Sequence, residues 1–188
     1  MIKDPSVVII GSGPSGFYAA EAITKKLNSD IDIIDRLPTP FGLIRGGVAP
    51  DHQTTKKISF FFTKTAKKDQ IGFFGNIEIG KDILIEELRD IYDVVILAIG
   101  SELDNKLEIE GSNLKGVHGS AEFVGWYNGH PDYVNLDPNL NTNNVVVIGN
   151  GNVAIDIVRV LSKTSEEMTE SDIPECALNT LIQSPIKN

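Results

Sequence analysis

The stretch VVIIGSGPSGFYAA, residues 7–20, decides the fold, because a short apolar run meets a glycine-rich turn and then a helical pattern. The apolar and largely β-branched Val7–Ile10 favours a buried strand. The turn GSGPSG places Gly11, Gly13 and Gly16 at the spacing of a dinucleotide-binding fingerprint. In that fingerprint the first glycine permits a tight turn, the second lets the backbone approach a pyrophosphate, and the third permits close packing of the helix.

A second apolar run, Ile31–Ile34, ends at Asp35, which lies 24 residues after Gly11. A carboxylate at about this separation binds the ribose of a dinucleotide in folds of this kind. The sequence therefore predicts Asp35 as a ribose ligand. The other interpretation is a solvated charge at the end of a strand.

A second fingerprint, GNGNVA, occupies residues 149–154. We expect a strand over Asn144–Ile148 before it and an amphipathic helix over Val153–Leu161 after it. Ala154 replaces the third glycine. The N-terminus of a helix favours a bound phosphate in both fingerprints, so the pair indicates a protein that handles two nucleotides.

The rest of the pattern predicts further alternation of strands and helices. We expect a loop over 37–50, a helix over 54–68, a strand over 73–79 and a short helix over 83–88. The run DVVILAIG, residues 93–100, is nearly continuously apolar, which predicts a strand buried on both faces of a parallel sheet.

Composition excludes several classes of function. The chain has 188 residues, and no apolar run is long enough to cross a bilayer. The formal charge of −9 disfavours nucleic acid as a partner. Cys176 is the single cysteine, so an intrachain disulfide and a redox-active cysteine pair are excluded. We expect no metal site, because His118 and His130 have no Cys, His or acidic neighbours at metal-ligand spacing.

The expected location is the cytoplasm. The first strand begins about six residues after Met1, which leaves no room for a targeting peptide. A single cysteine also fits a reducing compartment.

Five separated motifs resemble a known family. The segment PFGLIRGGVAPDH, residues 40–52, occurs in order with GSGPSGFYAAEA, FFGNIEIG, FVGWYNG and GNGNVAIDIVRVL. Together they are similar to the adrenodoxin reductase type of ferredoxin–NADP reductase. The resemblance implies electron transfer from NADPH through FAD to an iron–sulfur protein of ferredoxin or adrenodoxin type.

The resemblance also implies the architecture. The expected fold class is α/β, a Rossmann-like flavoprotein with parallel sheets and two dinucleotide sites, in truncated form. Residues 1–103 would be the amino-terminal part of an FAD-binding domain, and residues 104–188 an incomplete NADP-binding domain.

The resemblance assigns cofactor contacts position by position. The expected ligands of the FAD pyrophosphate are Gly11, Gly13, Ser15 and Gly16. The expected contacts of the adenosine ribose and the flavin nucleotide are Asp35, Leu43 and Ile79. The expected segment for the NADP pyrophosphate is Asn150, Gly151, Asn152 and Val153.

Two further side chains are candidate catalytic residues by resemblance. His52 and Asp156 would lie near the junction of flavin and nicotinamide, where they could hydrogen-bond, orient the nicotinamide or relay a proton. The alternative is structural: His52 caps the helix expected near Thr54, and Asp156 pairs with Arg159 or Arg45.

The chain departs from the family in length. The arginine pair that reads the 2′-phosphate of NADP and the glycine-rich segment that covers the flavin have no counterpart here, so the choice of NADPH rests on resemblance alone. A second chain that supplies these parts is one candidate partner. The alternative functions are a stand-alone module that binds FAD or another nucleotide without turnover, and a remnant without activity.

Overall fold

The structure of the protein is a computed structural model that describes residues 4–101 and 103–186. The described chain divides into two compact units. The first contains the residues up to Arg45 together with Thr55–Ser101, and the second contains Gly46–Thr54 together with the residues from Leu103 onward. The predicted cofactor roles of residues 1–103 and 104–188 stay predictions. The loop Gly46–Thr54 packs with the later residues rather than with its neighbours in sequence.

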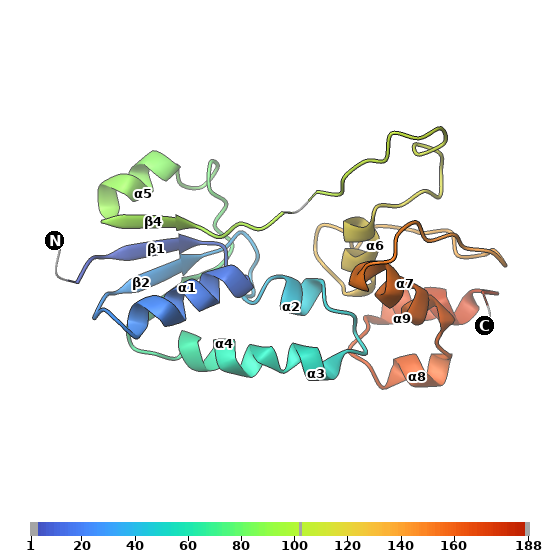
Figure 1. Ribbon diagram of the computed structural model, residues 1–188, viewed down its shortest axis with the longest axis horizontal. Coiled ribbons are helices and arrows are strands. Elements are labelled where there is room, and N and C mark those ends of the chain that lie inside the picture. Colours follow the sequence, from blue (N-terminus) through green and yellow to red (C-terminus); the bar gives the residue numbers. More distant parts are fainter. Residues whose placement is uncertain (1–3, 102, 187–188) are drawn as a thin grey trace. The chain divides into compact units, whose positions relative to one another are not determined.

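The first unit is built on a parallel four-stranded sheet (Figure 1). Its strands are β1 (Val7–Ile10), β2 (Ile31–Ile34), β3 (Ile71–Phe74) and β4 (Val94–Leu97), in the order β3-β2-β1-β4. Its longer helices are α1 (Pro14–Thr24), α4 (Ile58–Ala66) and α5 (Ile85–Ile91). Because parallel strands need crossover connections, the helices lie between successive strands. The predicted α/β fold class is confirmed.

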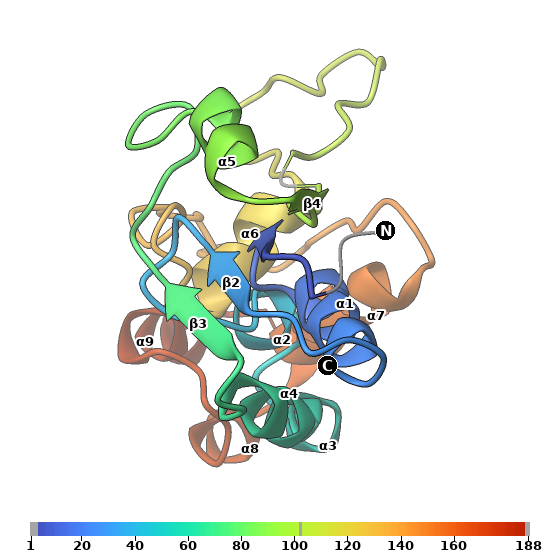
Figure 2. The same ribbon diagram turned by 90° about the vertical axis from the view of Figure 1, so that its left-hand side faces the viewer.

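Helices cover both faces of this sheet. Figure 2 shows α1 and α4 on one face and α5 on the other. Side chains alternate between the faces along each strand. One face packs Val7, Ile9, Ile31 and Ile33 with Phe17 and Phe62, and the other packs Val8, Ile10 and Ile34 with Leu88. The rings of Phe17 and Phe62 stack at 5.3 Å, which fixes α1 against α4.

Four predicted elements need correction. The helix expected over 54–68 is divided into α3 (Gln53–Lys56) and α4. The strand expected over 73–79 is the shorter β3, and the helix expected over 83–88 is α5. The prediction that the run 93–100 is buried on both faces is wrong. Within the described sheet β4 is an edge strand, and Val94 and Leu97 are exposed there.

The second unit is helical in its described part. Its helices are α6 (Ser120–Tyr127), α7 (Asn152–Ser162), α8 (Ser165–Thr169) and α9 (Glu175–Gln183). Trp126, Tyr127, Val160 and Met168 lie at the centre of its core. The GWYNG motif therefore contributes to packing of this unit.

The strand predicted over Asn144–Ile148 is wrong for this structure, because no regular element forms there. A strand requires backbone hydrogen bonds to a neighbour. The described part of the second unit offers this segment no neighbouring strand. Val146 is 84% exposed and Ile148 is 69% exposed, so the apolar pattern is present without the packing that it predicts.

Candidate functional site

The first fingerprint forms a tight turn that requires glycine at two of its positions. Gly11 follows β1 with φ +107°, and a Cβ at this position would overlap the carbonyl group of Ala98. A Cβ at Gly16 would overlap the carbonyl oxygen of Gly11. Gly11 and Gly16 therefore allow α1 to begin directly against the end of the sheet.

Gly13 has a different role. It is the N-cap of α1, with φ −74° and ψ −174°, a conformation that other residues adopt readily. No heavy atom lies within 4 Å of a Cβ built on it. The fold itself does not require glycine here, so the missing side chain leaves room for a group outside the chain.

The donors around this space suit an anionic group such as a phosphate. The N–H groups of Ser15 and Gly16 lie in the first turn of α1 and have no acceptor within the helix. Pro14 occupies the first position of the helix, where a missing N–H costs nothing. Ser15 is exposed and Gly13 is partly exposed. The turn thus presents backbone donors on its open side, as binding of a pyrophosphate requires.

Asp35 supports this turn directly. Its Oδ2 accepts hydrogen bonds from the Ser12 backbone N–H at 2.8 Å and from the Ser12 hydroxyl at 2.5 Å. Its Oδ1 accepts from the Leu37 N–H at 2.9 Å. Asp35 is therefore partly buried and stabilises the turn through hydrogen bonds, rather than being a solvated charge. Its predicted contact with a ribose stays a prediction.

The loop after β2 packs onto the same turn. The N–H of Phe41 donates to the Ser12 carbonyl oxygen at 3.0 Å, and Phe41 has φ +91°. Such a φ is unfavourable for a bulky residue and is held by its surroundings. A Cβ at Gly42 would lie 2.9 Å from the Cα of Gly13. This close approach places the first residues of the segment 40–52 beside Gly13.

Two predicted flavin contacts lie elsewhere in the first unit. Leu43 is exposed at the start of α2 (Leu43–Gly46). Ile79 forms an isolated parallel bridge with Ile83 and packs on the sheet face that α5 covers. Their contacts with a flavin nucleotide stay predictions.

The second fingerprint repeats the geometry of the first within the second unit. Gly149 has φ +136°, and Gly151 is the N-cap of α7 with φ −78° and ψ 174°. No heavy atom lies within 4 Å of a Cβ built on Gly151. The Cβ of Ala154 lies 3.5 Å from a Cβ built on Gly149, an ordinary van der Waals contact. This spacing explains why alanine is accepted at the third position.

The N-terminus of α7 is also open. The four predicted NADP ligands, Asn150, Gly151, Asn152 and Val153, are exposed. The first backbone bond of the helix runs from the Ile155 N–H to the Gly151 carbonyl oxygen at 3.1 Å. The N–H groups of Asn152, Val153 and Ala154 precede it and have no acceptor within the helix. The geometry suits a second phosphate group.

The candidate catalytic residues face each other within the second unit. His52 belongs to the loop Gly46–Thr54, and Asp156 belongs to α7. The His52 Nδ1 lies 3.7 Å from the Asp156 Oδ2, which is an ion-pair distance rather than a hydrogen bond. Asp156 also accepts from Arg159 Nη1 at 2.7 Å. The structural pair considered for Asp156 therefore exists, and His52 faces the other oxygen of the same carboxylate.

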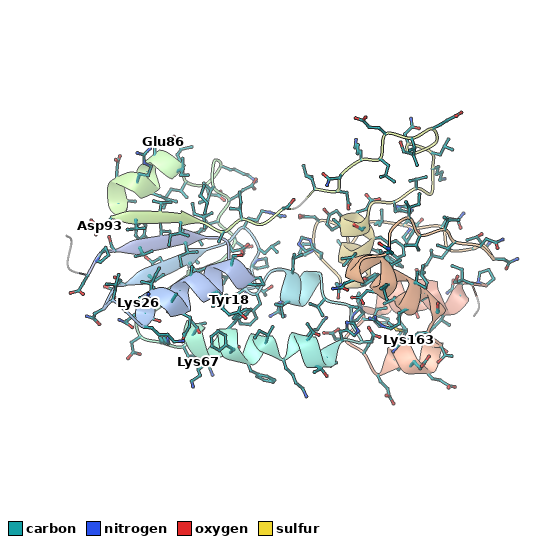
Figure 3. The ribbon with its side chains drawn as sticks, viewed as in Figure 1. Tyr18, Lys26, Lys67, Glu86, Asp93 and Lys163 are labelled. Carbon is teal, nitrogen blue, oxygen red and sulfur yellow. The ribbon has the colours of Figure 1, made fainter. Side chains whose placement is uncertain are left out.

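A second acidic residue, Asp51, completes this cluster. Asp51 accepts from Arg159 Nε and Nη2, both at 2.9 Å, and from Lys163 at 2.9 Å. Figure 3 labels Lys163, which follows the last residue of α7. The hydrogen bonds from Arg159 lower the pKa of Asp51 well below its ordinary value, although burial acts in the opposite direction. The role of Asp51 was not predicted from the sequence, because its partners lie more than 100 residues away along the chain.

Tyr127 is a second residue that the sequence did not single out for chemistry. It is fully buried near this cluster, and its hydroxyl has no hydrogen-bond partner among the described residues. Burial, reinforced by the charge of Asp156, raises its pKa above the ordinary value.

The described residues also bear on a metal site and on a membrane span. The described residues contain no group of three or more His, Cys, Asp or Glu side chains that could hold a metal ion. The prediction that His118 and His130 have no acidic neighbours is wrong, because the Nδ1 of His118 lies 3.0 Å from Glu122 and the Nδ1 of His130 lies 3.8 Å from Asp132. No helix in 4–101 or 103–186 is long and apolar enough to span a membrane.

The chain is similar in sequence to known proteins that are named for the use of a pyridine nucleotide or NADPH. The profile of the family described as pyridine nucleotide-disulphide oxidoreductase matches residues 5–171. The mitochondrial NADPH:adrenodoxin oxidoreductase of Arabidopsis thaliana is 48% identical over 183 residues, covering 96% of this chain and 38% of that enzyme. The human enzyme of the same name is 43% identical, and the match covers 98% of this chain and 38% of that enzyme.

Bacterial relatives match to a similar extent. The NADPH-ferredoxin reductase FprA of Mycobacterium leprae is 45% identical, covering 93% of this chain and 40% of that protein. The structure of Mycobacterium tuberculosis FprA in complex with NADPH superposes with a TM-score of 0.92 and 42% identity, covering 95% of this chain and 41% of that one. The chain thus spans about two fifths of the length of these relatives, and it corresponds to an amino-terminal portion. The predicted resemblance to adrenodoxin reductase is confirmed.

Proposed function

Because the chain belongs to the pyridine nucleotide-disulphide oxidoreductase family, we propose that it is the nucleotide-binding portion of an NADPH-dependent flavoprotein. In this proposal electrons pass from NADPH through FAD to an iron–sulfur protein of ferredoxin or adrenodoxin type. The observation that carries the proposal is the pair of matching turns, in which Gly13 and Gly151 each cap a helix and leave its first N–H groups open. Two such turns suit an enzyme that binds two dinucleotides.

The turn of the first unit would hold the pyrophosphate of FAD. The N–H groups of Ser15 and Gly16 would donate to it, and Gly13 would allow the backbone to come close. Asp35 would keep the turn in place through Ser12 while its remaining lone pairs accept from ribose hydroxyls. When bound, FAD supplies the conversion between two-electron donation by NADPH and one-electron delivery to an iron–sulfur centre.

The turn of the second unit would hold the pyrophosphate of NADPH at the N-terminus of α7. Names of the relatives support this choice of nucleotide, since they specify NADPH. We further propose that Asp156 orients His52 through Nδ1, which leaves Nε2 to exchange a hydrogen bond or a proton at the reacting end of the nucleotide. His52 is suited to this role, because its side chain is 42% exposed.

This chemistry differs from what the family's description suggests. The description refers to disulphides, whereas these 188 residues contain the single, exposed Cys176. A redox-active cysteine pair within the chain is therefore excluded. In this proposal the electron acceptor is an external iron–sulfur protein, and the relatives named for adrenodoxin and ferredoxin support that choice.

Further partners and location belong to the proposal as well. A separate polypeptide that supplies the remaining part of the relatives' length is a second candidate partner. Cytoplasmic location stays a prediction, since the relatives include proteins named as mitochondrial and a mycobacterial one.

The first experiment measures the absorbance spectrum of the purified chain after incubation with FAD and desalting, followed by anaerobic addition of NADPH. We expect a retained flavin band that bleaches when NADPH is added. A retained band that does not bleach would contradict turnover and support the alternative, a nucleotide-binding module. Loss of the flavin on desalting would contradict the proposed FAD site in this chain.

The second experiment tests His52. In the His52→Gln variant we expect slower flavin reduction with FAD still bound, because an amide cannot relay a proton at Nε2. His118→Gln is the matched control, since His118 also faces a carboxylate in the same unit but lies outside the pair. An unchanged reduction rate in His52→Gln would reject the role of the imidazole.

A further inference from the structure

The loop that carries His52 is held on the second unit by several independent contacts. Ala49 is fully buried in the core of that unit. The Pro50 carbonyl oxygen accepts from the Asp172 N–H at 3.4 Å. Asp51 follows with its ion pairs to α7, and its side chain is only 8% exposed. The residue directly before His52 is thus the most strongly anchored charged group of the loop.

The anchor uses the whole guanidinium group of Arg159. Nε and Nη2 donate to the two oxygens of Asp51, and Nη1 donates to Oδ1 of Asp156. A planar guanidinium has fixed donor directions, so the bidentate contact with Asp51 also fixes the direction of Nη1. One oxygen of Asp156 is therefore held, and Oδ2 is the oxygen that faces His52.

We infer that Asp51 is a positioning residue for the pair formed by His52 and Asp156. It acts in two ways: it orients Arg159, and it balances a positive charge that would otherwise oppose the attraction of Asp156 for the imidazole. Lys163 forms its ion pair with Asp51, at 2.9 Å. That Asp51 matters for the reaction rests on the proposed role of His52. That Asp51 fixes the geometry of the pair does not depend on that role.

The tautomer of His52 gives a direct readout. A carboxylate facing Nδ1 favours a proton on that nitrogen, and which nitrogen carries the proton follows from such contacts. Nitrogen-15 NMR of the imidazoles at neutral pH reports this ratio without any bound cofactor. The chain has three histidines, so His118 and His130 serve as internal references in every spectrum.

We expect the Asp51→Asn variant to lower the ratio of Nδ1–H to Nε2–H tautomers of His52 about threefold, a factor in keeping with partly exposed ion pairs. Asp156→Asn should lower it at least as much. Lys163→Gln is the matched control, because it removes a partner of Asp51 and leaves both contacts with Arg159 in place; it should leave the ratio near that of the parent chain. The ratios of His118 and His130 should stay constant.

An unchanged ratio in Asp51→Asn, together with a lowered ratio in Asp156→Asn, would overturn the inference. If circular dichroism shows that Asp51→Asn is unfolded, Arg159→Lys decides instead. Lysine keeps the charge but cannot contact both carboxylates through a planar fork, so the same lowering is expected and a constant ratio would refute it.

Activity separates this inference from the proposed function. With FAD and NADPH present, we expect Asp51→Asn to slow flavin reduction less than His52→Gln does. If His52→Gln reduces flavin at the parent rate, the proposed role of His52 fails, and the tautomer ratios still decide whether Asp51 positions the pair.

Discussion

Replacement of Gly13 by alanine separates binding of the cofactor from stability of the fold. Gly13 caps α1 in an extended conformation that alanine adopts without strain, and a Cβ there meets no heavy atom within 4 Å. The same methyl group would stand where a pyrophosphate must approach the N–H groups of Ser15 and Gly16. The substitution therefore changes the space offered to a ligand and very little inside the protein.

Two opposing effects set the change in stability. Alanine restricts the unfolded chain more than glycine does, which stabilises the folded state by about 0.4–1 kcal/mol. Alanine is a poorer N-cap than glycine, which costs about 0.5–1 kcal/mol. The free energy of unfolding of Gly13→Ala should therefore stay within about 0.5 kcal/mol of the parent value.

The effect on FAD should be far larger. A methyl group between the backbone and a phosphate removes at least one hydrogen bond to a charged group, worth about 1.5–3 kcal/mol. This range corresponds to a dissociation constant for FAD about 10- to 150-fold higher.

The assay combines urea unfolding with titration of FAD fluorescence on the same samples. Gly16→Ala is the control, because its methyl group would overlap the Gly11 carbonyl oxygen and should cost about 1–3 kcal/mol of stability. Parent-like affinity for FAD in Gly13→Ala would refute the assignment of the pyrophosphate to this turn. A loss of more than 2 kcal/mol in its unfolding free energy, on the order of a clash, would refute the open surroundings of Gly13.

Two further predictions concern stability. Tyr127→Phe should leave the free energy of unfolding unchanged or raise it by about 1 kcal/mol in urea denaturation, because its buried hydroxyl finds no hydrogen-bond partner among the described residues and such a group is costly. A loss above about 1 kcal/mol would reveal a hydrogen bond to that hydroxyl. Glu21 accepts from Lys68 at 2.6 Å and from Thr65 at 2.9 Å, and its pKa is lowered from 4.5 to about 2, chiefly by the contact with Lys68. Its folded pKa lies below the unfolded one, so its contribution is complete above pH 4.5 and is lost as the pH falls toward 2. The gap in urea midpoint between the parent and Glu21→Gln should therefore narrow over that range, and a constant gap would contradict the pairing.

The first site could be predicted from sequence because its determinants are local. Gly11, Gly13 and Gly16 lie within six residues, and the turn needs only the preceding strand and the following helix to form. Asp35 could be placed at the same edge because parallel strands end together there. Its bracing of Ser12 could not, because that depends on which donors the folded turn points inward.

The cluster around His52 could not be predicted from the sequence, because its members come from distant parts of the chain. Asp51 and Arg159 are 108 residues apart, and neither residue type is unusual on a surface. Their pairing follows from the packing of the loop Gly46–Thr54 against α7, which no periodicity encodes. The sequence supplied His52 and Asp156 only through resemblance, and the residue that fixes their geometry emerged from the folded arrangement.

The second fingerprint shows which part of such a motif is autonomous. Gly149 and Gly151 adopt the same turn as their counterparts in the first unit, although Asn144–Ile148 forms no strand. The turn and the start of α7 therefore depend on local glycines and on the spacing that Ala154 allows, whereas the strand depends on neighbours. In the first unit, the Gly11 N–H is also bonded to the Ile34 carbonyl oxygen at 2.8 Å, which ties the turn to the sheet. The geometry of the turn before α7 is thus encoded locally, but the described residues fix it from the helix side alone, so the first turn is the more firmly preorganised of the two.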